Sequence, residues 1–135
     1  MAIGSIELSP ADTDFGDELP AGSVLLQGQY TITQFINSGG FGITYLAKDG
    51  LNRNVVIKEC FVGAYCRRTK SRVRARSQGS KPGFDIIVRH FLNEARRMAT
   101  LVHPNIVGVR QVFEENDTAY MALDYIEGMD LLQAI

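Results

Sequence analysis

Glycines gathered between two strand-like stretches are the first feature of this sequence that could do chemistry. Gly39, Gly40 and Gly42 fall within four residues, and alternating β-branched and aromatic residues stand on both sides. Glycine allows the backbone to approach a ligand closely and to turn N–H groups toward phosphate oxygens. The same residues are also typical of an ordinary hairpin turn. The cluster alone therefore gives weak support for a phosphate-binding loop.

A lysine further along the chain could supply positive charge to such a loop. Lys58 follows the apolar run Val55–Ile57, and the two-residue period of a strand places it on the same face as Val56. A lysine at a strand end commonly extends into water. That purely structural role is the alternative to phosphate binding.

An acid inside an apolar helical stripe is the third feature. From about residue 85 to residue 102, apolar side chains recur every three or four residues, as on one face of a helix. Glu94 falls within this stripe, and most other polar residues fall on the far side. A carboxylate facing a core is costly unless a cation meets it. We expect Glu94 to pair with Lys58; a helix-edge residue that reaches solvent is the alternative.

Several strands and one helix must position these residues. Strands are predicted over residues 29–35, 43–47, 54–59, 106–113 and 119–125, with the helix between the third and the fourth. The basic stretch 61–84 has little periodicity and is predicted to be an inserted loop.

Composition limits the class of protein. The chain has 135 residues, 45% of them apolar and 21% charged, which fits one folded domain and excludes a disordered chain. No window is apolar enough for a membrane span, and no secretory signal is visible. Two cysteines, Cys60 and Cys66, make neither a disulfide framework nor a metal site, so no metal ligand is predicted. A reduced, cytoplasmic setting is the expectation.

The net charge of −1 hides two blocks of opposite sign. Residues 1–20 carry five acids and no base, and residues 67–81 carry seven bases and no acid. One interpretation is two solvated segments; the other is that the basic block docks on an acidic surface, RNA or an anionic headgroup. Because residues 67–81 lack an aromatic platform for base stacking, no nucleic-acid function is predicted.

In chain order, these features resemble the N-terminal lobe of a eukaryotic-like protein kinase, closest to the bacterial serine/threonine kinases, over residues 28–135. The matching pieces are Gly39–Ala47, Val55–Glu59, His103–Val107 and Tyr120–Gly128. The resemblance implies an α+β fold, with a five-stranded antiparallel sheet, one long helix and the start of a further helix at the C-terminus. It divides the chain into an acidic, partly flexible leader (1–27), the lobe itself (28–127, with the basic insertion 61–84) and the start of a C-terminal lobe (128–135).

The resemblance also implies an ATP site. Its glycine loop covers the phosphates, and Lys58, held by Glu94, contacts the α- and β-phosphates. Leu123 stands at the gatekeeper position, and Asp130 resembles the acid that reaches the ribose. The nucleotide-binding residues that it implies are Ile36, Asn37, Gly39, Gly40, Phe41, Gly42, Thr44, Val56, Lys58, Leu123, Asp124, Ile126 and Asp130. Asp124 and Ile126 would contribute backbone groups to adenine. Asn37 replaces the usual first glycine, and Thr44 replaces the usual valine.

Motifs needed for phosphoryl transfer are missing from these 135 residues. No H-R-D occurs, and the only D-F-G, Asp14–Gly16, precedes the glycine loop. We therefore expect no catalytic residue in this chain beyond the supporting Lys58–Glu94 pair, and no activity of the chain alone. The longer parent would phosphorylate protein serine or threonine with ATP, and its C-terminal lobe would hold Mg²⁺. The alternative is a kinase-like interaction module without catalysis, with self-association or a separate C-terminal lobe as its partner.

Overall fold

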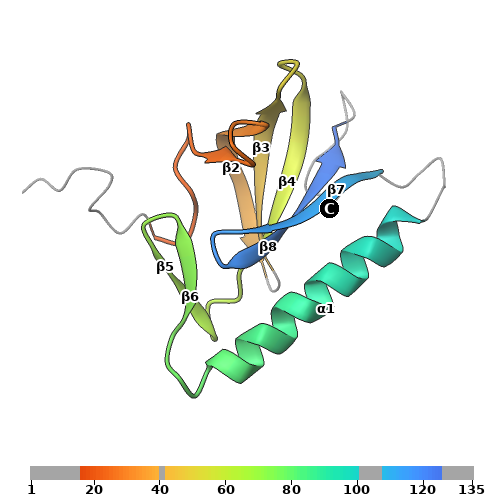
Figure 1. Ribbon diagram of the computed structural model, residues 1–135. Helices are drawn as coiled ribbons and strands as arrows, with labels where there is room; N and C mark the ends of the chain where they lie inside the picture. The colour runs from red at the N-terminus through yellow and green to blue at the C-terminus, as the bar shows by residue number, and fades with distance from the viewer. Residues whose placement is uncertain (1–15, 40–41, 101–107, 126–135) are drawn as a thin grey trace, which may run out of the picture.

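The computed structural model describes residues 16–39, 42–100 and 108–125. Six strands of this part form one antiparallel sheet in the order β1-β2-β3-β4-β8-β7, and one helix lies along it (Figure 1). The strands of this sheet are β1 (Val24–Leu25), β2 (Tyr30–Gly39), β3 (Gly42–Asp49), β4 (Asn54–Cys60), β7 (Val109–Glu115) and β8 (Thr118–Asp124). The sheet and the single long helix confirm the predicted α+β fold; the short β1 is a sixth strand that was not predicted.

Because side chains alternate along each strand, the two faces of the sheet contribute to two different hydrophobic clusters. On one face, Tyr45, Ile57 and Tyr120 join the larger hydrophobic core. On the other face, Val56 and Met121 pack against the helix.

The helix, α1 (Lys81–Ala99), begins earlier than the sequence pattern predicts. Proline is compatible with the first turn of a helix, and Pro82 stands there. Phe84, Leu92 and Ala95 form its buried face, which contacts β7 and β8. No helix in the described part of the chain is long and apolar enough to cross a membrane.

The basic insertion is not the loop that we predicted. It contains a two-stranded hairpin, β5 (Cys66–Thr69) and β6 (Arg72–Ala75), and its last residues start α1. Cys66 and Val73 are fully buried, and exposed bases alternate with them. The density of arginine hides this two-residue period in the sequence.

The N-terminal segment also contributes to the core. Leu19 and Leu25 are buried, and both belong to the larger core cluster. The expected domain boundary at residue 28 therefore separates side chains that share one core. The expected start of a further helix, within residues 128–135, lies outside the described residues.

Candidate functional site

Expected nucleotide-binding residues from four strands, β2, β3, β4 and β8, lie in two adjacent rows across the sheet. In the first row, Asn37 pairs with Thr44, Thr44 with Lys58, and Lys58 with Met121. Directly paired residues of neighbouring strands share a face and lie side by side. Lys58 is thus flanked by Thr44 on one side and by Met121 on the other.

The second row is apolar and lies two residues from the first row on each of β3, β4 and β8. Val56 pairs with Leu46 on β3 and with Leu123 on β8. Val56 and Leu123 are buried, and both belong to the cluster that includes Ala95 of the helix. Since Lys58 and Val56 are two residues apart, the structure places Lys58 on the helix side of the sheet.

Gly42 holds the backbone of the glycine segment directly against β4. A Cβ atom at this position would lie 2.4 Å from the carbonyl oxygen of Glu59 and 3.6 Å from Cε of Lys58. Only glycine permits this approach, so the backbone after the glycine turn passes beside the lysine. Gly39, at the other end of the turn, faces open space. Gly40 and Phe41 lie outside the described residues.

The expected pair between Lys58 and Glu94 is not formed in this structure. Glu94 instead accepts a 2.5 Å ion pair from Arg97, one turn along the same helix, and 44% of its side chain is exposed. The physical reason is the orientation of α1, whose buried face is centred on Leu92 and Ala95. This orientation leaves Glu94 at the helix edge, within reach of an i+3 partner.

The end of β8 is fixed by polar contacts. The Arg110 side chain forms an ion pair with Asp124 at 3.2 Å and a second ion pair with Asp49 at 2.9 Å. Hydrogen bonds that Asp49 accepts from backbone N–H groups lower its pKa, and the bond from Arg53 has the largest effect. The Asp124 N–H donates to the Gly108 carbonyl at 2.9 Å, so a backbone contact from Asp124 to adenine would use its carbonyl. Ile126 and Asp130 lie outside the described residues.

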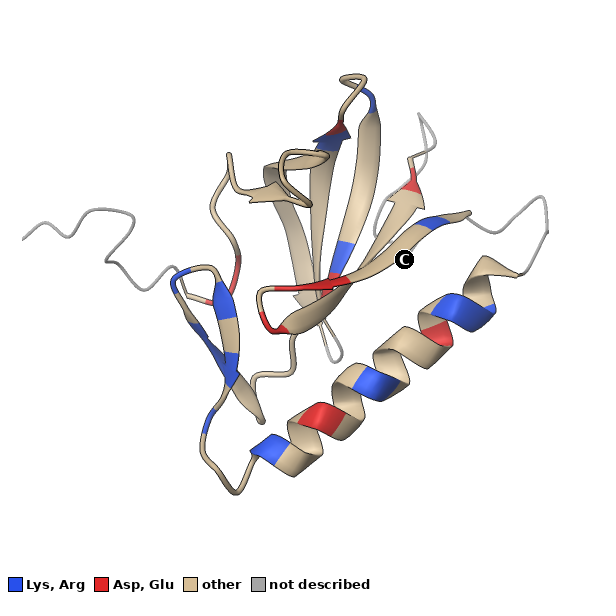
Figure 2. Ribbon diagram, in the orientation of Figure 1, with Lys and Arg blue, Asp and Glu red and all other residues tan. Residues whose placement is uncertain are grey.

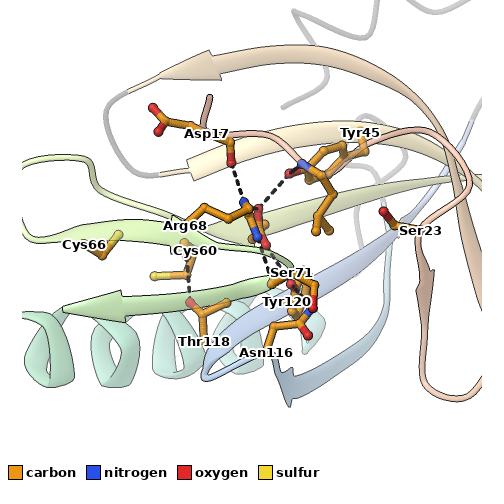
Figure 3. Close-up of polar contacts among 12 residues, drawn as sticks. Asp17, Ser23, Tyr45, Cys60, Cys66, Arg68, Ser71, Asn116, Thr118 and Tyr120 are labelled. Carbon is orange, nitrogen blue, oxygen red and sulfur yellow. Dashed lines mark hydrogen bonds and ion pairs between the residues drawn. The ribbon is translucent and has the colours of Figure 1, made fainter. Parts of the chain in front are cut away.

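A buried polar cluster around Glu59 was missed by the sequence reasoning and lies on the opposite face of the sheet. Glu59 is fully buried, and its carboxylate accepts hydrogen bonds from Tyr45 at 2.7 Å and from Tyr120 at 2.6 Å. It also accepts a 2.5 Å ion pair from Arg68, whose side chain is 1% exposed. Figure 3 shows Arg68 between the backbone of Asp17 and this pair of tyrosines. The sequence did contain a signal for this cluster: Glu59 stands two positions after Ile57 and therefore shares its buried face of β4.

Burial and the neighbouring carboxylate change the acidity of both tyrosines. Desolvation, followed by the negative charge of Glu59, raises the pKa of Tyr45 and of Tyr120 well above the ordinary value. Both phenols therefore stay protonated as hydrogen-bond donors to Glu59 at any ordinary pH. These contacts connect β3, β4, β5 and β8 through one carboxylate in the core.

Comparison with known proteins gives consistent matches to kinases. The chain is 32% identical over 111 residues to the serine/threonine-protein kinase PrkC of Bacillus subtilis, and 34% identical over 104 residues to PknD of Chlamydia pneumoniae. These matches cover 82% and 76% of the chain, which spans only 14% and 9% of the length of these relatives. No family model matches the chain.

Solved structures agree with the sequence matches. The apo form of PpkA-294 superposes with a TM-score of 0.78 at 32% identity, over 87% of this chain and 42% of that one. The kinase domain of PknI from Mycobacterium tuberculosis, at 22% identity and a TM-score of 0.57, shares the fold over 86% of this chain and 40% of that one.

Proposed function

Because the chain belongs to the bacterial serine/threonine protein kinases, whose N-terminal lobe it forms, we propose that it is an ATP-binding lobe. Its ligand would lie on the face of the sheet that carries Lys58 and Val56. The longer protein of which this lobe is part would transfer the γ-phosphoryl group of ATP to serine or threonine of a protein substrate, with Mg²⁺ held by its C-terminal lobe.

The contact between Gly42 and the strand of Lys58 is the observation that carries this proposal. A phosphate chain needs backbone N–H groups and a cation at the same place. Here Gly42 has no side chain, and a Cβ atom built on it would lie only 3.6 Å from Cε of Lys58. Val56 and Leu123 of the second row are the apolar side chains that an adenine ring would contact; both are covered in this structure by the cluster that includes Ala95, so the ring would have to displace part of that packing.

Each residue of the site would have a distinct task. Lys58 would donate hydrogen bonds to phosphate oxygens, and Thr44 would border it from the neighbouring strand. Glu94 would hold Lys58 once it exchanges Arg97 for that partner. The Arg97 contact is half exposed, and an exposed ion pair of this type contributes little stability. The exchange therefore sacrifices little ion-pair energy, and its main requirement is a rotation of α1 that brings Glu94 toward Lys58.

The test is nucleotide titration of the 135-residue chain and two lysine variants. Removing a charged hydrogen-bond donor costs about 1.5–3 kcal/mol, so Lys58→Met is expected to lower ATP affinity by about 10- to 100-fold. Lys48→Met is the matched control, because Lys48 stands on β3 at the far end of its pairing with β4. Isothermal titration calorimetry measures both; equal affinities in the two variants would contradict the proposed role of Lys58.

The same titration separates the alternative function. We propose that the chain binds ATP without transferring phosphate, because H-R-D is missing from its sequence. A chain without any affinity for ATP would instead favour the interaction module. Labelled phosphate incorporated into casein or into the chain itself, and lost in Lys58→Ala, would overturn the proposed lack of transfer.

A further inference from the structure

The inserted hairpin has two chemically different faces. Cys66, Arg68 and Val73 point toward the core, and the side chain of Arg68 is almost fully buried. The residues that alternate with them are all exposed and form what we call the arginine face: Arg67, Thr69, Arg72 and Arg74. Figure 2 shows the bases on both strands of the hairpin.

The arginine face carries positive charge that the described residues neutralise only in part, through Asp117, which pairs with Arg72 and attracts Arg74 at longer range. Arg67 and Arg74 are direct cross-strand partners, and like charges in that position destabilise a hairpin. Arg72 has an ion pair with Asp117 at 2.8 Å. Among residues 16–39, 42–100 and 108–125, the side chains of Arg67 and Arg74 have no hydrogen bond and no ion pair. An anionic partner would remove this repulsion.

The underside of the hairpin holds the arginine face in place. Arg68 binds the Glu59 carboxylate at 2.5 Å, and the Val73 N–H donates to the Asn116 carbonyl at 2.8 Å. Both strands are thereby attached to the main sheet. A rigid presentation reduces the entropy that a partner must overcome on docking.

The chain itself contains an acidic segment of opposite charge. Residues 1–15 carry Glu7, Asp12 and Asp14 and no base. This segment joins the described fold at the hairpin, because the Asp17 carbonyl accepts a 2.7 Å hydrogen bond from Arg68 of β5. At about 3.6 Å per residue, Asp14 lies within about 11 Å of Asp17 along the chain, and Asp12 within about 18 Å.

We propose that the acidic segment, residues 1–15, docks in cis on the arginine face. Asp12 and Asp14 are two residues apart, so in an extended chain their carboxylates point the same way, about 7 Å apart. The guanidinium groups of Arg67 and Arg74 have the fork geometry that binds a carboxylate through two hydrogen bonds. Attachment at Asp17 keeps the local concentration of the segment high. RNA is disfavoured because no aromatic residue lies within 67–81.

A spin label on the acidic segment tests this docking. Ser9→Cys can be labelled selectively, because burial raises the pKa of Cys60 to about 12 and that of Cys66 to about 11, which keeps both native thiols unreactive. In the ¹⁵N-labelled full chain, the amide signals of β5 and β6 are expected to broaden. Raising the ionic strength to about 1 M, where the Debye length is about 3 Å, should abolish the broadening.

Charge reversal provides the controls. The double variant Arg67→Glu/Arg74→Glu should lose the broadening, and adding Asp12→Arg/Asp14→Arg should restore it. The matched control Arg89→Glu/Arg96→Glu changes the net charge equally on exposed positions of α1 and should keep it. Asp12→Asn/Asp14→Asn alone, which leaves the folded part untouched, should also lose it.

Three results would overturn the proposal. The first is a hairpin whose signals do not broaden at low salt. The second is broadening that survives reversal of Arg67 and Arg74. The third is broadening that arises only when spin-labelled and ¹⁵N-labelled chains are mixed, because the segment would then dock on a second copy.

Discussion

Two consecutive residues of β4 carry opposite charges to opposite faces of the sheet. Lys58 lies on the helix side, beside the backbone of Gly42. Glu59 lies in the core, where one arginine and two tyrosines satisfy its carboxylate. The residue proposed to bind phosphate is thus adjacent to the most strongly held side chain of the strand. Substitutions at this scale should separate the two functions.

Arg68→Ala is expected to lower the free energy of unfolding by about 3–5 kcal/mol, because it leaves the buried Glu59 carboxylate without its cation. Arg67→Ala, one residue earlier on the exposed face of the same strand, should leave the urea midpoint nearly unchanged. Urea unfolding followed by circular dichroism measures both. Equal midpoints would show that the buried pair adds nothing to stability.

Stability is expected to fall as the pH rises above about 10. In the unfolded chain, tyrosine ionises near its ordinary value of 10.0, whereas Tyr45 and Tyr120 keep their protons in the fold. The unfolded state alone then loses these protons, which costs the fold about 1.4 kcal/mol per pH unit and per tyrosine. Chemical unfolding at pH 9 to 11 should show a shallower decline in Tyr120→Phe. An identical decline in the variant would contradict this assignment.

At the scale of elements, the two glycines that flank the turn between β2 and β3 differ in how closely they are packed. A side chain at Gly42 would collide with the Glu59 carbonyl, whereas one at Gly39 would meet nothing within 4 Å. The turn is therefore anchored on the β3 side and open on the β2 side.

Gly42→Ala is expected to separate β3 from β4 locally, and to weaken ATP binding about 10-fold or more while lowering the melting temperature. Gly39→Ala should leave the melting temperature unchanged, because neither space nor backbone angle opposes the methyl group. Thermal unfolding and nucleotide titration of the two variants provide the comparison. A loss of stability in Gly39→Ala equal to that in Gly42→Ala would argue against this contact.

At the scale of the whole molecule, the segments that flank the sheet belong to one cooperative core. Leu25→Ala is expected to cost about 2–5 kcal/mol of unfolding free energy, because Leu25 is 1% exposed. The neighbouring Val24→Ala, at a residue that is 55% exposed, is the control and should change little. If both variants unfold at the same urea concentration, residues before β2 do not contribute to the core.

Sequence reasoning recovered the parts of the fold that have a clear hydrophobic period. The strands around Tyr45, Ile57 and Ala122 and the helix around Phe91 could be predicted because apolar residues recur at spacings of two or of three to four. The hairpin β5–β6 could not, since arginine occupies three of its four exposed positions and one buried position. A buried arginine becomes visible only when its partner, here Glu59, is known to face it across the fold.

The placement of the candidate residues could be predicted better for the strands than for the helix. The alternation of Val56 and Lys58 correctly indicates a shared face, because strand geometry leaves only two directions. The direction of the Glu94 side chain depends on how far α1 is rotated about its axis. Because the apolar stripe of a helix is about 100° wide, the sequence does not show whether a residue near its edge faces the core or the solvent. In this structure, the rotation of α1 places Glu94 where it forms an ion pair with Arg97 instead of Lys58.

The opposite orientations of Lys58 and Glu59 restrict how this lobe can move. A slip of β4 by one residue would exchange their places, burying an ammonium group among phenols and moving the carboxylate to the face proposed to bind phosphate. Sliding of this strand is therefore too costly to serve as a switch. We therefore expect the central strands to stay in register as a fixed frame during any movement of the helix that brings Glu94 toward Lys58.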